Sequence, residues 1–96
     1  MKEITDIIQS PLFARKKKKL NRKQIKDLDE AIRTIAQDPE TGTLKTGDLS
    51  GVRVYKFNSA NSLILLAYEI IETTLFLYTF GSHQNFYREL KKYINR

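Results

Sequence analysis

The sequence contains no cysteine and a single histidine, His83, among its 96 residues. Without cysteine there is no disulfide framework and no thiolate nucleophile, and one imidazole cannot build a histidine-rich metal site. No apolar run is long enough to span a bilayer, and the first ten residues, MKEITDIIQS, include acids. We therefore expect a cytoplasmic protein with no metal, no small-molecule cofactor and no membrane partner.

Acidic residues are also missing from one segment, Ser10 to Lys26, in a chain whose formal net charge is +6. Such a run creates a local positive field that attracts polyanions, chiefly nucleic acid, through phosphate contacts and counterion release. It is equally compatible with a solvated helix face that keeps a small protein soluble. The basic residues of the segment are Arg15, Lys16, Lys17, Lys18, Lys19, Arg22, Lys23 and Lys26.

The N-terminal third predicts a short strand and a first helix. The apolar residues between Ile4 and Ile8 indicate the strand. Ser10 and Pro11 are typical of an N-cap and a first helical position, so we expect a helix from there to about Leu20.

A second helix is predicted directly afterwards. Asn21 and Gln24 have the spacing of a capping box. The segment DPETG, Asp38 to Gly42, ends the helix because proline cannot continue it and glycine favours a turn. Its apolar stripe, at steps of three, four and three, consists of Ile25, Leu28, Ile32 and Ile35.

The second half of the chain predicts a strand meander and a final helix. GVRVYKF, SLILLAYEII and TTLFLYTF are rich in β-branched and aromatic residues, which is typical of three consecutive antiparallel strands. Leu63 to Ile71 is apolar on both faces, so we expect that strand to be central. Ser82 can cap a helix in which Phe86, Leu90 and Ile94 recur every four residues. The expected fold class is α+β, one domain over residues 1–96, with a small antiparallel sheet packed against an N-terminal helical hairpin and a C-terminal helix.

In order and spacing, the basic helical hairpin, DPETGTLKTGDLSGVRVYKF, the meander and the closing GSHQNFY together resemble the RelE/ParE superfamily of bacterial type II toxins. The chain is most similar to the RelE-like branch, including YafQ-like toxins, whose last segment carries a glycine, a histidine and an aromatic residue at the positions of Gly81, His83 and Tyr87. The resemblance implies a small sheet backed by two helices and a cognate antitoxin as partner. On this branch it also implies cleavage of mRNA on the ribosome.

Metal-free RNA cleavage has three chemical requirements. The 2′-hydroxyl nucleophile must lose its proton, the departing 5′-oxygen must gain one, and charge on the pentavalent phosphate must be neutralised. Histidine is the side chain best suited to acid or base work near neutral pH, which makes His83 a candidate. Tyr87 would share a helix face with it, and could stack on a base, orient the nucleotide or take part in proton transfer.

Charge stabilisation is assigned by the resemblance to Arg53 and Lys56. Arg53 corresponds to the first basic strand position of RelE-like toxins, and Lys56 lies close to a further histidine of YafQ-like members. Their odd separation places them on opposite faces of a regular strand, so both reach one phosphate only if a bulge or a strand end intervenes. The chain departs from the family near Leu63, where RelE-like toxins carry a second arginine, and in having one histidine in place of several. We expect the imidazole, the phenol and the Arg53 guanidinium to converge in one shallow pocket.

The lysine-rich segment suits the phosphate backbone of ribosomal RNA, where positioning matters more than base recognition. It could equally receive an acidic antitoxin segment. The predicted RNA-binding residues are Lys16, Lys17, Lys18, Lys19, Arg22 and Lys23.

Other functions remain compatible with the sequence. Glu69 could be a general base in an apolar strand, although we favour a place at the exposed end of that strand. A ParE-like toxin would bind and inhibit DNA gyrase without catalysis, and a generic RNA-binding module is a third possibility. The pair of His83 and Tyr87, which binding alone does not require, favours a ribosome-dependent, metal-independent mRNA endoribonuclease.

Overall fold

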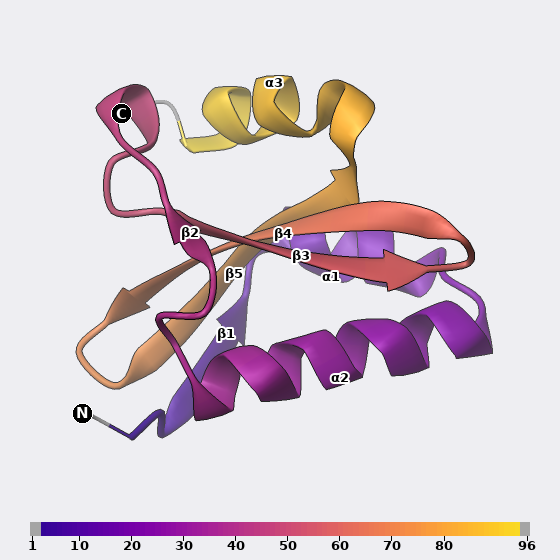
Figure 1. Cartoon of the computed structure of the whole chain (residues 1–96), viewed down its shortest axis with the longest axis horizontal. Helices are drawn as coiled ribbons and strands as arrows, with labels where there is room; N and C mark the ends of the chain where they lie inside the picture. Colours follow the sequence, from indigo (N-terminus) through magenta and orange to yellow (C-terminus); the bar gives the residue numbers. More distant parts are fainter. Residues whose placement is uncertain (1–2, 95–96) are drawn as a thin grey trace.

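A computed structural model describes residues 3–94 as a mixed α+β fold, in which five strands form one sheet in the order β1-β5-β4-β3-β2 (Figure 1). In chain order the elements are β1 (Asp6–Gln9), α1 (Pro11–Lys18), α2 (Arg22–Gln37), β2 (Thr43–Leu44), the 3-10 turn η1 (Gly47–Leu49), β3 (Arg53–Ser59), β4 (Ser62–Ile71), β5 (Thr74–Ser82) and α3 (His83–Ile94).

The predicted order of elements is confirmed, and so are the antiparallel meander β3-β4-β5 and the central place of β4. Three details differ. The sheet is not wholly antiparallel, because β1 pairs in parallel with β5. The short β2 and η1 were not predicted, and α1 ends at Lys18, two residues before the expected end. The direction of β1 could not be inferred because its partner β5 is the last strand of the meander and is separated from β1 by both N-terminal helices, so no local turn fixes their pairing.

Both N-terminal helices start at the predicted caps. The Ser10 hydroxyl accepts a hydrogen bond from the Phe13 N–H at 2.9 Å and donates one to the Tyr78 carbonyl at 2.6 Å, which fixes the start of α1 against β5. In α2 the Asn21 side chain accepts from the Gln24 N–H at 2.8 Å, and the Gln24 side chain accepts from the Asn21 N–H at 3.0 Å. This reciprocal pair satisfies two backbone donors that the helix itself leaves unbonded.

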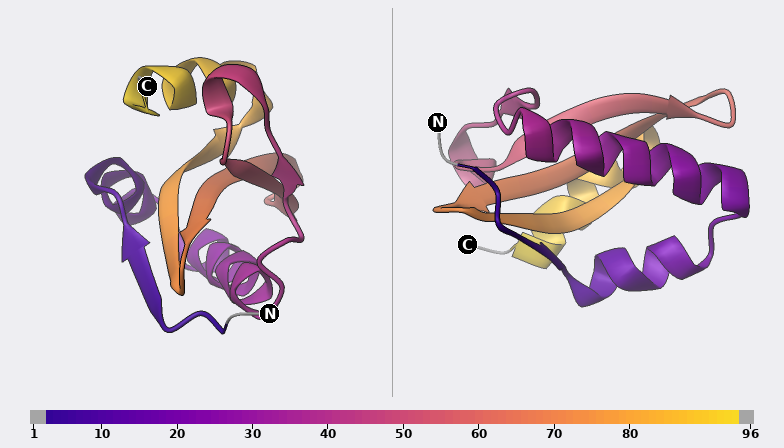
Figure 2. Two further views of the ribbon diagram at one scale, coloured as in Figure 1. Left: turned by 90° about the vertical axis from the view of Figure 1, so that its left-hand side faces the viewer. Right: turned by 90° about the horizontal axis from the view of Figure 1, so that it is seen from below.

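The sheet separates two layers of helix. The hairpin helices α1 and α2 lie on one face and α3 lies on the other (Figure 2). Along β4, Leu66 and Tyr68 join the core under the hairpin, whereas Leu65 and Ala67 join the core under α3. This alternation explains why the strand is apolar on both faces.

Tyr68 fixes the loop that leaves α2. Its side chain is fully buried, and its hydroxyl donates to the Pro39 carbonyl at 2.7 Å and accepts from the Gly42 N–H at 2.9 Å. Burial raises the pKa of the Tyr68 phenol. A Cβ atom on Gly42 would lie 2.7 Å from the Tyr68 oxygen, so glycine is required there by close approach. The loop therefore enters β2 in a fixed position.

Candidate active site

The imidazole and phenol predicted to act together lie on adjacent turns of α3. His83 is the first residue of that helix, directly after the last residue of β5, and it is exposed. Its ring centroid lies 5.9 Å from that of Tyr87 in an edge-to-face arrangement. Phe86 is buried in the core under α3, as its place in the apolar stripe predicted, and the half-buried Tyr87 packs against the same core, with its ring centroid 5.1 Å from that of Phe86. His83 is therefore exposed, whereas Tyr87 is only partly accessible.

Lys56 lies on the same face of the sheet as α3. It follows Val54 by two residues in β3, and Val54 is part of the core beneath α3. The pairing register places Lys56 opposite Leu65, and Leu65 opposite Gly81, two residues before His83. The side chain is exposed.

Arg53 is on the other face. Its guanidinium donates to the Gly42 carbonyl at 2.8 Å and to the Glu40 carbonyl at 3.3 Å, and lies 4.0 Å from the Glu40 carboxylate. The register of β3 is regular, so no bulge brings Arg53 round to the side of Lys56. The expectation that the Arg53 guanidinium shares a pocket with the imidazole and the phenol is therefore wrong. The alternation of side chains along β3 places Lys56, and not Arg53, on the face that α3 covers.

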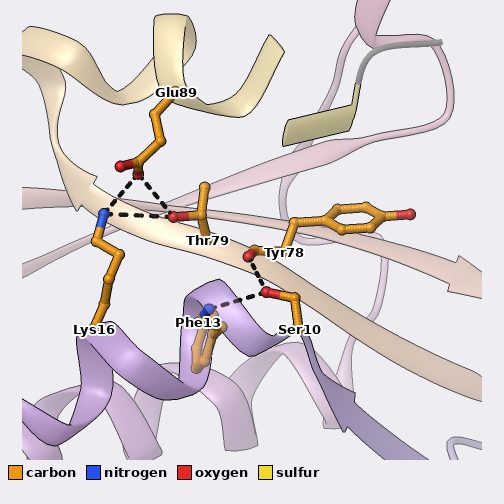
Figure 3. A network of polar contacts seen from close by, with 6 residues as sticks. All are labelled: Ser10, Phe13, Lys16, Tyr78, Thr79 and Glu89. Atoms are coloured by element: carbon orange, nitrogen blue, oxygen red, sulfur yellow. Dashed lines mark hydrogen bonds and ion pairs between the residues drawn. The ribbon is translucent and has the colours of Figure 1, made fainter. Parts of the chain in front are cut away.

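Lys16, part of the predicted RNA-binding segment, is a link between layers (Figure 3). Its ammonium reaches past β5 and lies 2.7 Å from the Glu89 carboxylate of α3 and 3.4 Å from the Thr79 hydroxyl. Thr79 also donates to Glu89, at 3.0 Å. The hydrogen bond from Lys16 is the largest cause of the lowered pKa of Glu89; burial opposes it, and the hydrogen bond from Thr79 makes a smaller contribution in the lowering direction. Lys16 thus links α1 to the helix that carries His83 on the other face of the sheet.

The other members of the basic segment divide into two groups. Lys17 forms an ion pair with Asp29 at 3.0 Å, and Lys23 forms one with Asp27 at 3.2 Å. The hydrogen bond from Ser59 and that from Lys23 lower the pKa of Asp27. Within residues 3–94, the predicted RNA-binding residues that form no ion pair are Lys18, Lys19 and Arg22.

A groove of about 690 Å³ runs between α1 and the end of β5. Leu20, Ile64 and Phe80 contribute apolar surface to it, while Lys18 and Lys19 contribute charge. A surface of this composition suits either a phosphate backbone or an acidic chain with apolar anchors. Both occupants expected for the basic segment therefore remain compatible with its form.

Glu69, considered above as a general base, is half-buried and has a partner within the sheet. The Glu69 carboxylate accepts a hydrogen bond from the Tyr78 hydroxyl at 2.8 Å, a structural contact at the half-buried end of β4. No group of three or more histidine or acidic side chains among the described residues could hold a metal ion. No helix in the same part of the chain is long and apolar enough to cross a membrane.

One residue near the site escaped prediction. The Lys45 ammonium lies 5.2 Å from the centroid of the Tyr87 ring. Lys45 is in the connection between β2 and η1, about forty residues earlier in the sequence, and no local pattern relates the two. The local sequence TGTLKTGD indicates only a loop lysine, and the place of Lys45 beside α3 depends on the tertiary structure.

Comparison with solved structures supports the fold. A chain of the intact E. coli RelBE toxin–antitoxin complex is 15% identical, with a TM-score of 0.67, covering 82% of this chain and 96% of that one. A mutant of the E. coli toxin RelE in the free state is 14% identical, with a TM-score of 0.74 and coverage of 96% and 95%. The isolated E. coli RelE toxin is 18% identical, with a TM-score of 0.64 and coverage of 91% and 95%.

Comparison with curated proteins gives no significant match. Residues 7–91, nearly the whole chain, match the family described as the ParE-like toxin of type II bacterial toxin–antitoxin systems. The RelE structures and this family lie within the superfamily that the sequence motifs indicated, and the sheet, the hairpin and the C-terminal helix occur in the expected order. The chain belongs to the ParE-like toxins of type II toxin–antitoxin systems, within the RelE/ParE superfamily.

Proposed function

We propose that this toxin is a ribosome-dependent, metal-independent mRNA endoribonuclease that inhibits translation. One observation carries the proposal: His83 is exposed at the start of α3, with the Tyr87 ring 5.9 Å away on the same helix. A toxin that acts only by binding has no need of an accessible imidazole beside a phenol. The RelE folds of the solved relatives are compatible with this activity.

In the proposed reaction the 2′-hydroxyl of the substrate attacks the adjoining phosphorus and its proton passes to a base. The bond from phosphorus to the 5′-oxygen breaks, and that oxygen gains a proton as it leaves. The products are a 2′,3′-cyclic phosphate and a 5′-hydroxyl. His83 supplies one of the two proton transfers, and Tyr87 shares in the other or orients the nucleotide.

Lys56 is the proposed source of positive charge for the pentavalent phosphate. It is exposed on the face of the sheet that α3 covers, two strands from the residues that lead into His83. We do not propose Arg53 for this role, because it lies on the opposite face and bonds the carbonyls of Glu40 and Gly42. Its proposed role is to hold the loop after α2.

The proposed partners are the ribosome with its mRNA and a cognate antitoxin, since one solved relative is part of a toxin–antitoxin complex. The groove beside α1 offers Lys18, Lys19 and the nearby Arg22 to ribosomal RNA or to an acidic antitoxin segment. Lys16, Lys17 and Lys23 already form ion pairs within the chain, so we expect them to contribute less to either contact. Steep dependence of binding on salt distinguishes the RNA contact from the protein contact.

The test is primer extension on cellular transcripts after brief expression of the toxin in bacteria. The expected result is cuts at fixed positions within codons, abolished by His83→Ala. Asn85→Ala is the matched control, because Asn85 is an exposed neighbour on the same helical turn. Equal cleavage by both variants would remove His83 from the mechanism. Thermal melting of both variants shows whether a loss of cleavage in His83→Ala is due to loss of folding.

A second function is favoured by the family description, which is that of a ParE-like toxin. A ParE-like protein would poison DNA gyrase by binding. Intact transcripts together with DNA breaks and an SOS response would establish that alternative, and His83→Ala would then remain toxic. Binding of RNA with neither cleavage nor DNA damage would indicate an RNA-binding module without catalysis.

A further inference from the structure

A cleft of about 450 Å³ lies beside the candidate active site, between η1 and α3. Tyr87 and Lys91 line it from α3, one helical turn apart, and Lys45 and Asp48 line it from the opposite side. The cleft therefore combines two cations, one carboxylate and an aromatic ring. It is separate from the groove beside α1, which has none of these residues in its lining.

Lys45 is held at this place by the backbone. Its N–H donates to the Val52 carbonyl at 2.8 Å, which fixes the loop across the entrance to β3. The side chain is half-buried, and its ammonium lies 5.2 Å from the centroid of the Tyr87 ring. Within the described part of the chain, neither Lys45 nor Lys91 has an ion-pair partner. Both charges are thus available to an anion entering the cleft.

We propose that this cleft binds a nucleotide of single-stranded RNA next to the cleaved bond, with Lys45 and Lys91 contacting its phosphates. The inference rests on the proposed nuclease function, because it assigns the cleft to the same substrate. Asp48 favours a whole nucleotide over free phosphate, since a carboxylate accepts hydrogen bonds from the amino groups of a base but repels an anion. Tyr87 would join the two sites, since its ring lies near-perpendicular to that of His83 and has the Lys45 ammonium over its face.

The test uses a short fluorescent RNA in which every 2′-hydroxyl is methylated, so that the probe binds without being cleaved. Its affinity for the toxin is measured from low to moderate salt. Lys91→Gln is compared with Lys92→Gln, because the two lysines are exposed neighbours on α3 and only Lys91 lines the cleft. The affinity falls as salt rises, and each lost phosphate contact makes the slope of log affinity against log salt less steep by about 0.7 for single strands. We expect this decrease in Lys91→Gln and in Lys45→Gln, and an unchanged slope in Lys92→Gln.

Equal slopes for Lys91→Gln and Lys92→Gln would overturn the inference, and so would a wild-type toxin that does not bind the probe. Cleavage is scored separately by primer extension. Codon-specific cuts with indistinguishable Lys91→Gln and Lys92→Gln slopes would refute the cleft while leaving the nuclease intact. The predicted difference in slope without any cleavage would support RNA binding in the cleft, and would refute both the nuclease and the position of that nucleotide next to a cleaved bond.

Discussion

Removal of the Lys16 ammonium tests whether this residue links the helical layers. In Lys16→Met the aliphatic stem is retained, while the 2.7 Å contact with Glu89 and the position over the Phe80 ring, 5.5 Å from its centroid, are lost. The Lys16 and Glu89 side chains are 29% and 40% exposed. Because both side chains are partly exposed, solvent screens the pair, and we take its contribution from the range of surface ion pairs, about 0.2 to 1 kcal/mol. Their partial burial favours the upper end of that range.

We expect Lys16→Met to lower the free energy of unfolding by about 1 kcal/mol, the sum of a screened ion pair and a weak contact with the ring. For a domain of this size, that change lowers Tm by about 4 to 8 °C. Lys18→Met is the matched control, since Lys18 is in the same last turn of α1 and has the same favourable interaction with the helix dipole. Thermal unfolding followed by circular dichroism at neutral pH measures both.

The pH dependence provides a second criterion. The pKa of Glu89 is lowered from its ordinary value of 4.5, chiefly by the hydrogen bond from Lys16. The stabilisation is therefore present above that value and is lost as the pH falls through the lowered one. The difference between wild type and Lys16→Met should shrink in acid. Equal melting of the two lysine variants at neutral pH, or a difference that persists undiminished in acid, would refute the assignment.

Three other changes follow from the structure. Tyr68→Phe leaves a buried N–H and a buried carbonyl without their partner, and should cost about 1 to 3 kcal/mol in urea unfolding. Burial raises the pKa of Tyr68 above 10.0, so the wild type should lose stability above that pH as this phenol ionises. Tyr68→Phe has no such phenol and should lose less stability over the same pH range. Equal losses in the two proteins would contradict this reasoning. Gly42→Ala places a methyl group 2.7 Å from the Tyr68 oxygen and should destabilise by about 1 to 3 kcal/mol, so a neutral result would show that the loop can move. Asn21→Ala removes the cap of α2 and should cost about 0.5 to 2 kcal/mol, while the exposed Arg22→Ala should leave Tm nearly unchanged.

The sequence predicted which segments form the candidate site. It did not predict which side chains of those segments lie together. Phe86 belongs to an apolar stripe with period four, so its burial followed from helix geometry, but the packing of Tyr87 against the same core did not. Arg53 and Lys56 had to lie on opposite faces of β3, but which face α3 would cover depends on the path of the chain after β5. Lys45 reaches Tyr87 only because the connection through η1 folds back beside α3.

Local chemistry was sufficient for the caps, the apolar stripes and the meander, because each depends on residues a few positions apart. Ser10, Asn21 and the alternation along β4 specify their elements whatever the rest of the chain does. Packing across the sheet decided the rest. It made Lys16 an internal ion-pair partner, and it fixed β1 parallel to β5. Such contacts join segments distant in sequence, and their energies depend on which surfaces the complete fold brings together.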